Sequence, residues 1–220
     1  TEGLVVPGLD VVVDGDVPLG AGLSSSAALE MATARALADA AALEWDPVRM
    51  ARLGQKAENQ YVGMNCGIMD QFASAVSREG HALLLDCRSL ETRAVPVPPD
   101  VAVVVMDTGA RRSLAGSAYN DRRAACERVV AHLQKRDPSV RALRDVSLEI
   151  LEGERDHLDP VDLKRARHVV PENTRPVQMA DALQAGRLEE ANALFQEAEA
   201  IQKVGQPEYP FFYSWRAYIY

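Results

Sequence analysis

Residues 18–31 of this 220-residue chain read Pro-Leu-Gly-Ala-Gly-Leu-Ser-Ser-Ser-Ala-Ala-Leu-Glu-Met, and this segment is the most informative one. Gly20 and Gly22 let the backbone turn tightly and approach a ligand closely. Three serines then precede an alanine-rich segment of high helix propensity, where the first helical turn has unpaired N–H donors. The segment therefore predicts a loop that holds an anion, and we expect the anion to be a nucleotide phosphate.

Two common phosphate-binding motifs do not fit this loop. A Walker A loop needs a Lys after its second Gly, but the first Lys of the chain is Lys56. The dinucleotide fingerprint needs a third Gly three residues after the second, and that position is Ser25. A Ser/Gly turn that merely caps a helix remains the alternative.

Composition limits the class of protein. The 47% hydrophobic content is ample for a core, and the net charge of −8 argues against nucleic acid or an anionic membrane as the main partner. The three cysteines are odd in number and lack Cys-x-x-Cys spacing, which argues against a disulfide framework or a zinc site. No membrane-spanning run or signal peptide is recognisable, so we expect a cytoplasmic protein. Because the chain starts at Thr1 without Met, we also expect an upstream segment to be missing.

Apolar periodicity and turn residues predict mixed helices and strands. We expect a domain boundary near residue 100, after the proline-rich stretch 96–99. The expected strands are 9–17, 81–87 and 101–106, and the expected helices are 25–42, 47–61, a short one after Gly67, and a long one with the stripe Leu114, Ala118, Ala125, Val129 and Leu133. The rest to about Phe195 is expected to be helical, with loops at 156–159 and 171–176.

Phosphoryl transfer needs a phosphate loop, a divalent cation and a group that orients or deprotonates the attacking hydroxyl. Ser26 and Glu58 are candidates for Mg²⁺, although Glu58 has the alternative of a solvated helix residue. Asp70, at a helix start among apolar residues, is the candidate base, with a helix cap as its alternative. Tyr119 can donate its phenol to a small ligand, or lie at the edge of a core.

Five segments in order resemble the galactokinases, which belong to the GHMP family of small-molecule kinases. They are Pro18–Glu30, Cys66–Phe72, His81–Glu91, Ser117–Arg123 and Arg165–Val170. The resemblance runs from about residue 9 to 195. It implies an α+β fold with an N-terminal domain like ribosomal protein S5 domain 2 and a ferredoxin-like C-terminal domain. We expect the first domain over residues 1–100, without its first strands, and part of the second over residues 101–195.

The resemblance also implies roles for single residues. It implies ATP-dependent phosphorylation of galactose at the anomeric hydroxyl, with Asp70 as the catalytic base. It also implies that Gly67, Asp70 and Tyr119 contact the sugar, and that Ser26 and Glu58 are ligands of Mg²⁺. The ATP-binding positions that it implies are Gly20, Ala21, Gly22, Leu23, Ser24, Ser25 and Ser26. The implied partners are ATP and galactose, and the complete enzyme is expected to be a monomer.

Two family motifs are not found, so the chain is expected to be truncated at both ends. The family's first motif, with a Glu-His-Thr-Asp run that grips the sugar, and its third, glycine-rich motif have no counterpart here. Phosphoryl transfer depends mainly on positioning and electrostatics, so we expect this loss to lower activity. A kinase for N-acetylgalactosamine or arabinose, and a non-catalytic sugar and ATP sensor, remain alternatives.

Residues 196–220 do not resemble the family. Seven of the chain's twelve aromatic residues lie in the last twelve positions. This tail is expected to be foreign to the original gene, such as the product of an altered reading frame; a docking tail and a core-packing end segment are the alternatives.

Overall fold

The computed structural model describes residues 5–20, 22–99, 101 and 115–205, with only the backbone described for 115–119 and 198–205. Its contacts divide the chain into two compact units, a first unit made chiefly of Thr1–Ala94 and a second made chiefly of residues from Val95 onward. Each unit is described by itself. The expected boundary near residue 100, and the assignment of the family's two domains to residue ranges, stay predictions. Residues 102–106 of the expected strand 101–106, and the aromatic residues from Tyr209 onward, lie outside the described residues.

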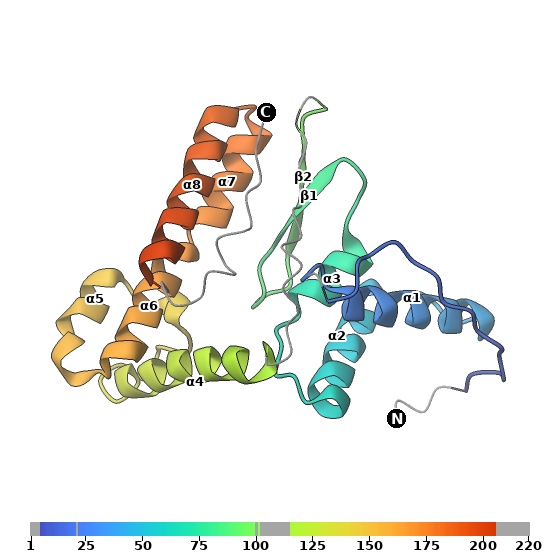
Figure 1. Ribbon diagram of the computed structural model, residues 1–220, viewed down its shortest axis with the longest axis horizontal. Coiled ribbons are helices and arrows are strands. Elements are labelled where there is room, and N and C mark those ends of the chain that lie inside the picture. Colours follow the sequence, from blue (N-terminus) through green and yellow to red (C-terminus); the bar gives the residue numbers. More distant parts are fainter. Residues whose placement is uncertain (1–4, 21, 100, 102–114, 206–220) are drawn as a thin grey trace. The chain divides into compact units, whose positions relative to one another are not determined.

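Three helices that pack against one another make up most of the first unit (Figure 1). They are α1 (Ser25–Ala40), α2 (Pro47–Ala57), which continues as a π-helical segment (Glu58–Val62), and α3 (Met69–Val76). Asp46 caps α2 by accepting a hydrogen bond from the Arg49 backbone N–H at 3.0 Å, and Pro47 occupies the first turn. These bounds confirm the expected helices, and Gly63, at φ 77°, ends the second as expected.

The core of the first unit is small and centred on α3. Phe72, 1% exposed, packs with Ala51 and Ile68, and Leu85 and Leu90 pack against this cluster. The last two residues belong to a hairpin of β1 (His81–Leu85) and β2 (Thr92–Pro96), which pair as a two-stranded sheet. β1 confirms the strand expected at 81–87. The sequence reasoning missed β2, whose alternating exposure at Thr92–Val95 is the period-two signal of a strand with one buried face.

The strand expected over 9–17 is wrong. Residues 9–17 have no strand geometry, and Val11, Val12 and Val13 are 57%, 95% and 63% exposed. A strand is stabilised by hydrogen bonds to a neighbouring strand, and in the described part of the chain β1 and β2 pair only with each other. The valines of this segment favour a strand locally, but in the described part of the chain the segment has no neighbouring strand to pair with.

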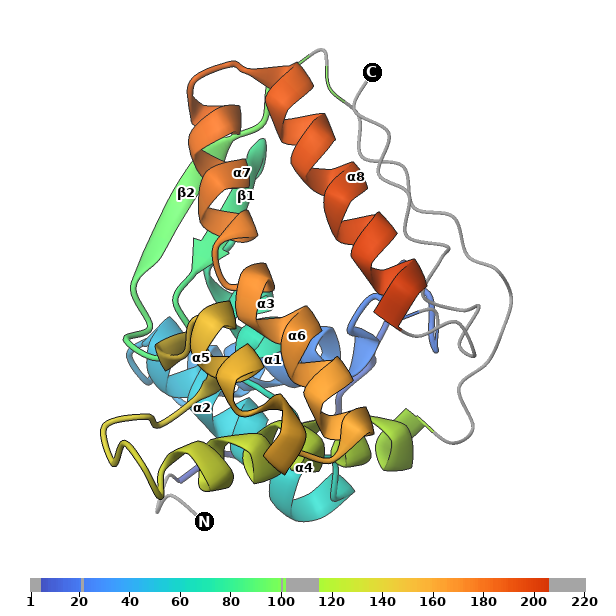
Figure 2. The same cartoon turned by 90° about the vertical axis from the view of Figure 1, so that its left-hand side faces the viewer.

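The second unit is helical. Helix α6 packs against α4, and α5 and α8 both pack on α6 (Figure 2). The helices are α4 (Ala115–Leu133), α5 (Leu148–Gly153), α6 (Pro160–Glu172), α7 (Arg175–Gln184) and α8 (Leu188–Gly205), with short 3-10 turns at Leu143–Asp145 and Arg155–His157. Its core includes Val129 and Leu151, both 0% exposed. Ala125, Val129 and Leu133 confirm the described part of the expected stripe on the long helix.

Two expected boundaries in this unit need correction. The loop expected at 171–176 is only Asn173–Thr174, because α6 includes Pro171 in its last turn and α7 has Pro176 in its first turn. Proline is tolerated in a first helical turn because its missing N–H has no intrahelical partner there. Helix α8 continues past Phe195 to Gly205, so the expected change at residue 196 falls inside a helix.

Candidate nucleotide and substrate site

The loop before α1 has the backbone that its glycines predict. Gly20 and Gly22 adopt φ of 72° and 80°, and Ser24 also has a positive φ of 56°. Ala21 lies outside the described residues. Ser24 is the N-cap of α1, but its side chain makes no capping hydrogen bond, so the alternative of a simple serine cap is not realised. A helix start after such a turn has N–H donors without intrahelical partners, which is compatible with the predicted anion site.

The residues between this turn and the first turn of α1 differ in their exposure to solvent. Leu23, Ser24 and Ser25 are partly buried, whereas Ser26, the second residue of α1, is exposed. Its hydroxyl is therefore available to a ligand that approaches the start of the helix.

Glu58 is a buried carboxylate rather than the solvated helix residue of the alternative interpretation. It begins the π-helical segment and is only 5% exposed. Glu30 of α1 lies near it, and the pKa of the Glu30 carboxyl is raised by burial first and by the charge of Glu58 in addition, while a hydrogen bond from Gln71 lowers it. Two carboxylates are thus held in one partly dehydrated region.

Ser26 and Glu30 lie one turn apart on the same face of α1, since they are separated by four residues. The charge of Glu58 contributes to the raised pKa of Glu30, after burial and against the hydrogen bond from Gln71, so these two carboxylates lie in one region of the first unit.

Asp70 lies in the first turn of α3 and is partly exposed, while Ile68 is the N-cap residue. Asp70 therefore does not occupy the capping position of the alternative interpretation. Gly67, just before the helix, is exposed, and a Cβ at this position would meet nothing within 4 Å. Because α3 packs on both α1 and α2, the elements that carry Ser26, Glu58 and Asp70 form one packed group.

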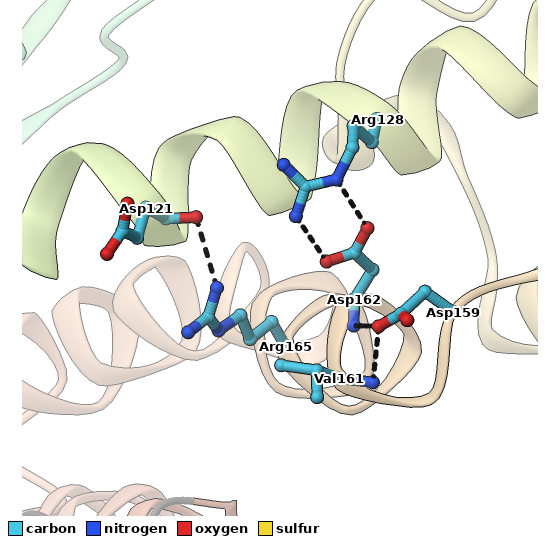
Figure 3. Close-up of polar contacts among 6 residues, drawn as sticks. All are labelled: Asp121, Arg128, Asp159, Val161, Asp162 and Arg165. Carbon is cyan, nitrogen blue, oxygen red and sulfur yellow. Dashed lines mark hydrogen bonds and ion pairs between the residues drawn. The ribbon is translucent and has the colours of Figure 1, made fainter.

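Tyr119 lies on α4 in the second unit, and its side chain is outside the described residues. The structure does bring together two of the segments that carry the family resemblance, 117–123 and 165–170. The Arg165 Nη1 donates to the Asp121 carbonyl oxygen at 3.0 Å, as Figure 3 shows. About two turns further along α4, the Arg128 guanidinium donates two hydrogen bonds of 2.7 Å to the buried Asp162 carboxylate. These contacts fix α6 against α4.

Sequence reasoning missed three residues that organise the first unit. Gln71 of α3 is 2% exposed and donates from Nε2 to Glu30 Oε2 at 3.1 Å, and Gly54 of α2 is buried beside them. The sequence held a signal for Gln71 and Glu30, because each is a polar residue inside a largely apolar helical stretch. Nothing in the sequence indicated that the two side chains meet, since 41 positions separate them.

Comparison with known proteins identifies the class. Residues 1–78 match the model of the GHMP kinases N terminal domain. The chain belongs to the GHMP kinases, and the α+β fold expected from the resemblance is confirmed.

The similarity extends to a particular branch of this family. A solved structure titled as Lactococcus lactis galactokinase complexed with galactose is 37% identical and superposes with a TM-score of 0.80. The match covers 86% of this chain and 49% of the Lactococcus chain, so this chain spans about half the length of that galactokinase. The chain is therefore a galactokinase-like GHMP kinase sequence with an incomplete two-domain architecture.

Proposed function

We propose that this chain carries the nucleotide loop, metal ligands and catalytic base of a kinase that transfers the γ-phosphoryl group of ATP to the anomeric hydroxyl of galactose. The observation that supports this most directly is the 37% identity, over 86% of the chain, with a galactokinase whose structure holds galactose. The positive φ of Gly20, Gly22 and Ser24, the buried carboxylate of Glu58 and the place of Asp70 in the first turn of α3 are compatible with this chemistry.

The residues fit a magnesium ion that is shared with nucleotide phosphates. Mg²⁺ prefers oxygen ligands and is usually held by one or two protein groups together with substrate phosphates. The exposed Ser26 and the buried Glu58 carboxylate supply such a pair of oxygen ligands in this proposal. Among the described residues no group of three or more His, Cys, Asp or Glu could hold a metal ion. When bound, Mg²⁺ supplies neutralisation of phosphate charge.

In the proposed reaction Asp70 accepts the proton of the anomeric hydroxyl. The hydroxyl oxygen forms a bond to the γ-phosphorus, and the bond from that phosphorus to the β–γ bridging oxygen breaks, which releases ADP and galactose 1-phosphate. The first-turn N–H groups of α1 and the loop at 20–26 orient the phosphates. Gly67, by lacking a side chain, leaves open space beside the start of α3 for the sugar. The family resemblance assigns Tyr119 to the sugar as well.

The experiment is galactose-dependent ADP release in Mg-ATP, measured for the wild type, Asp70→Asn and Asp39→Asn. Asp39 is a matched control because it is an exposed aspartate of the same unit, paired with Arg35 at 3.0 Å. We expect turnover in the wild type and the control, and a drop of at least about 100-fold in Asp70→Asn, the range of a lost general base. Equal rates in all three proteins would contradict the role of Asp70.

A panel of sugars tests the acceptor. Galactose, N-acetylgalactosamine and arabinose are compared at fixed Mg-ATP, and we expect the highest kcat/KM for galactose. A higher value for either other sugar would move the proposal to a related sugar kinase. Saturable nucleotide and galactose binding without turnover in a folded sample would favour a sensor.

A further inference from the structure

A partly buried hydrogen bond in the first unit joins the helix that follows the nucleotide loop to the helix that carries Asp70. Gln71 Nε2 of α3 donates to Glu30 Oε2 of α1 at 3.1 Å. Gln71 directly follows Asp70, and Glu30 lies one helical turn after Ser26. The pair thus connects the two elements to which the proposed function assigns the phosphate loop and the base.

Helix α2 leaves room for this pair through Gly54. A Cβ built on Gly54 would lie 3.0 Å from both Gln71 Cγ and Glu30 Oε2, and 2.6 Å from Met31 Cε. The hydrogen bond therefore sits where the three helices meet, enclosed by α2. Any residue other than glycine at position 54 would press on both of its partners.

Gln71 is a polar side chain buried in the core of the first unit, and its hydrogen-bond partner Glu30 is partly exposed. Gln71 is 2% exposed, and its Oε1 is buried with no hydrogen-bond partner among the described residues. Burying an acceptor without a partner costs free energy, and an apolar pair of similar shape often replaces a buried polar pair without loss. Stability alone therefore does not explain these two side chains.

A hydrogen bond supplies what apolar packing lacks, which is direction. Apolar contacts allow two helices to slide or rotate with little change in buried area, whereas a hydrogen bond weakens steeply when its distance or angle changes. Fixing Gln71 against Glu30 fixes the rotation of α3 about its axis and its height along α1. The adjacent residue, Asp70, is then held in one position relative to the helix that begins at the loop.

We propose that Glu30 and Gln71 are positioning residues, which hold the Asp70-bearing turn of α3 in register with the nucleotide loop. The inference rests on the proposed function, because register matters only if Asp70 and the loop act on one reaction. Neither side chain is assigned contact with ATP or the sugar.

The variants separate the hydrogen bond from charge and from packing. Glu30→Met and Gln71→Met remove the hydrogen bond and keep an unbranched apolar side chain of similar length. Glu30→Gln removes the charge, keeps a carbonyl oxygen for Gln71 Nε2, and adds an N–H₂ group that can donate to Gln71 Oε1. Gln71→Asn withdraws the amide by one methylene and serves if a Met variant is not folded by circular dichroism.

The kinetic readout is kcat against KM for Mg-ATP and galactose. We expect kcat to fall by about 10- to 100-fold in the Met variants, since a displacement of about 1 Å can cost that much, with each KM changed less than about twofold. Glu30→Gln should recover most of the lost kcat. If kcat fell equally in Glu30→Gln, the charge of Glu30 would be the important property and the proposal would be wrong. An unchanged kcat in folded Met variants would also overturn it.

A second readout needs no turnover. Hydrogen exchange is followed by mass spectrometry with and without the magnesium complex of a non-hydrolysable ATP analogue. In the wild type and Glu30→Gln, the analogue should slow exchange in residues 20–31 and also in 69–76; in the Met variants it should slow only the first segment. If the analogue protects neither segment of the wild type, the proposed function fails, and the positioning role fails with it. If it protects both segments equally in every variant, only the positioning role is refuted.

Discussion

Gly54→Ala is a sensitive test of how closely the three helices of the first unit meet. In a helix interior, replacing Gly with Ala gains about 1 kcal/mol of intrinsic propensity. Against this gain, the new methyl group would lie 2.6 Å from Met31 Cε and 3.0 Å from Gln71 Cγ and Glu30 Oε2. The Met31 terminus can rotate away, but the other two atoms belong to a hydrogen-bonded pair that has little freedom to move.

The structure therefore predicts that crowding exceeds propensity at this position. Inserting a methylene into a packed core costs about 1–3 kcal/mol, so the net loss in free energy of unfolding is about 1 kcal/mol. With a urea m-value of about 2 kcal/mol/M, the midpoint should fall by about 0.5 M at unchanged m. The assay is urea unfolding followed by far-ultraviolet circular dichroism, and by fluorescence of Trp45 in a Trp215→Phe background, because Trp45 lies in the first unit.

Gly153→Ala is the control for helix propensity without crowding. Gly153 is the last residue of α5, and a Cβ there would meet nothing within 4 Å. This variant should be as stable as the wild type or more stable by up to about 1 kcal/mol, measured by circular dichroism. A Gly54→Ala protein that gained stability as Gly153→Ala does would show that the Glu30–Gln71 pair yields to the methyl group, and would refute the packing argument.

Three further predictions concern stability. Phe72→Ala, at a side chain 1% exposed, should cost about 3–5 kcal/mol, and a loss below about 1 kcal/mol by urea unfolding would be incompatible with a core centred on α3. The Asp159 side chain accepts hydrogen bonds from the Val161 and Asp162 N–H groups at 2.8 and 3.2 Å. Asp159→Ala should therefore lower the free energy of unfolding by about 1 kcal/mol, and Asp159→Asn by less. Equal losses in the two variants would contradict a capping role. Burial lowers the pKa of His168; Arg175 and Arg122 also lower it, and Glu172 opposes them. The unfolded chain therefore binds more protons than the folded protein at acidic pH, so the free energy of unfolding should fall as the pH drops below about 6.5. His168→Leu should flatten that part of the pH profile, and an unchanged slope of urea midpoint against pH would exclude His168 as its cause.

Local sequence patterns predicted the helices well because their signals are local. Asp46 and Pro47 mark a helix start because Asp is a good N-cap residue and Pro fits the first helical turn. Gly20 and Gly22 have a positive φ, which few residues other than glycine adopt. The same local reasoning failed for residues 9–17, since a strand depends on a partner that propensity cannot supply. It missed β2 for the converse reason, because Thr92–Pro96 becomes a strand by pairing with β1.

The candidate site divides in a similar way. The sequence by itself determined the family resemblance, the loop at 20–26, and Glu58 and Asp70 as chemically suitable residues, because residue type and spacing along the chain carry that information. Only the tertiary structure showed that Glu58 is buried near Glu30 and that Glu30 bonds to Gln71 across 41 positions. Burial, charge proximity and hydrogen-bond partners depend on distances in space, and those distances follow from how α1, α2 and α3 pack around Gly54.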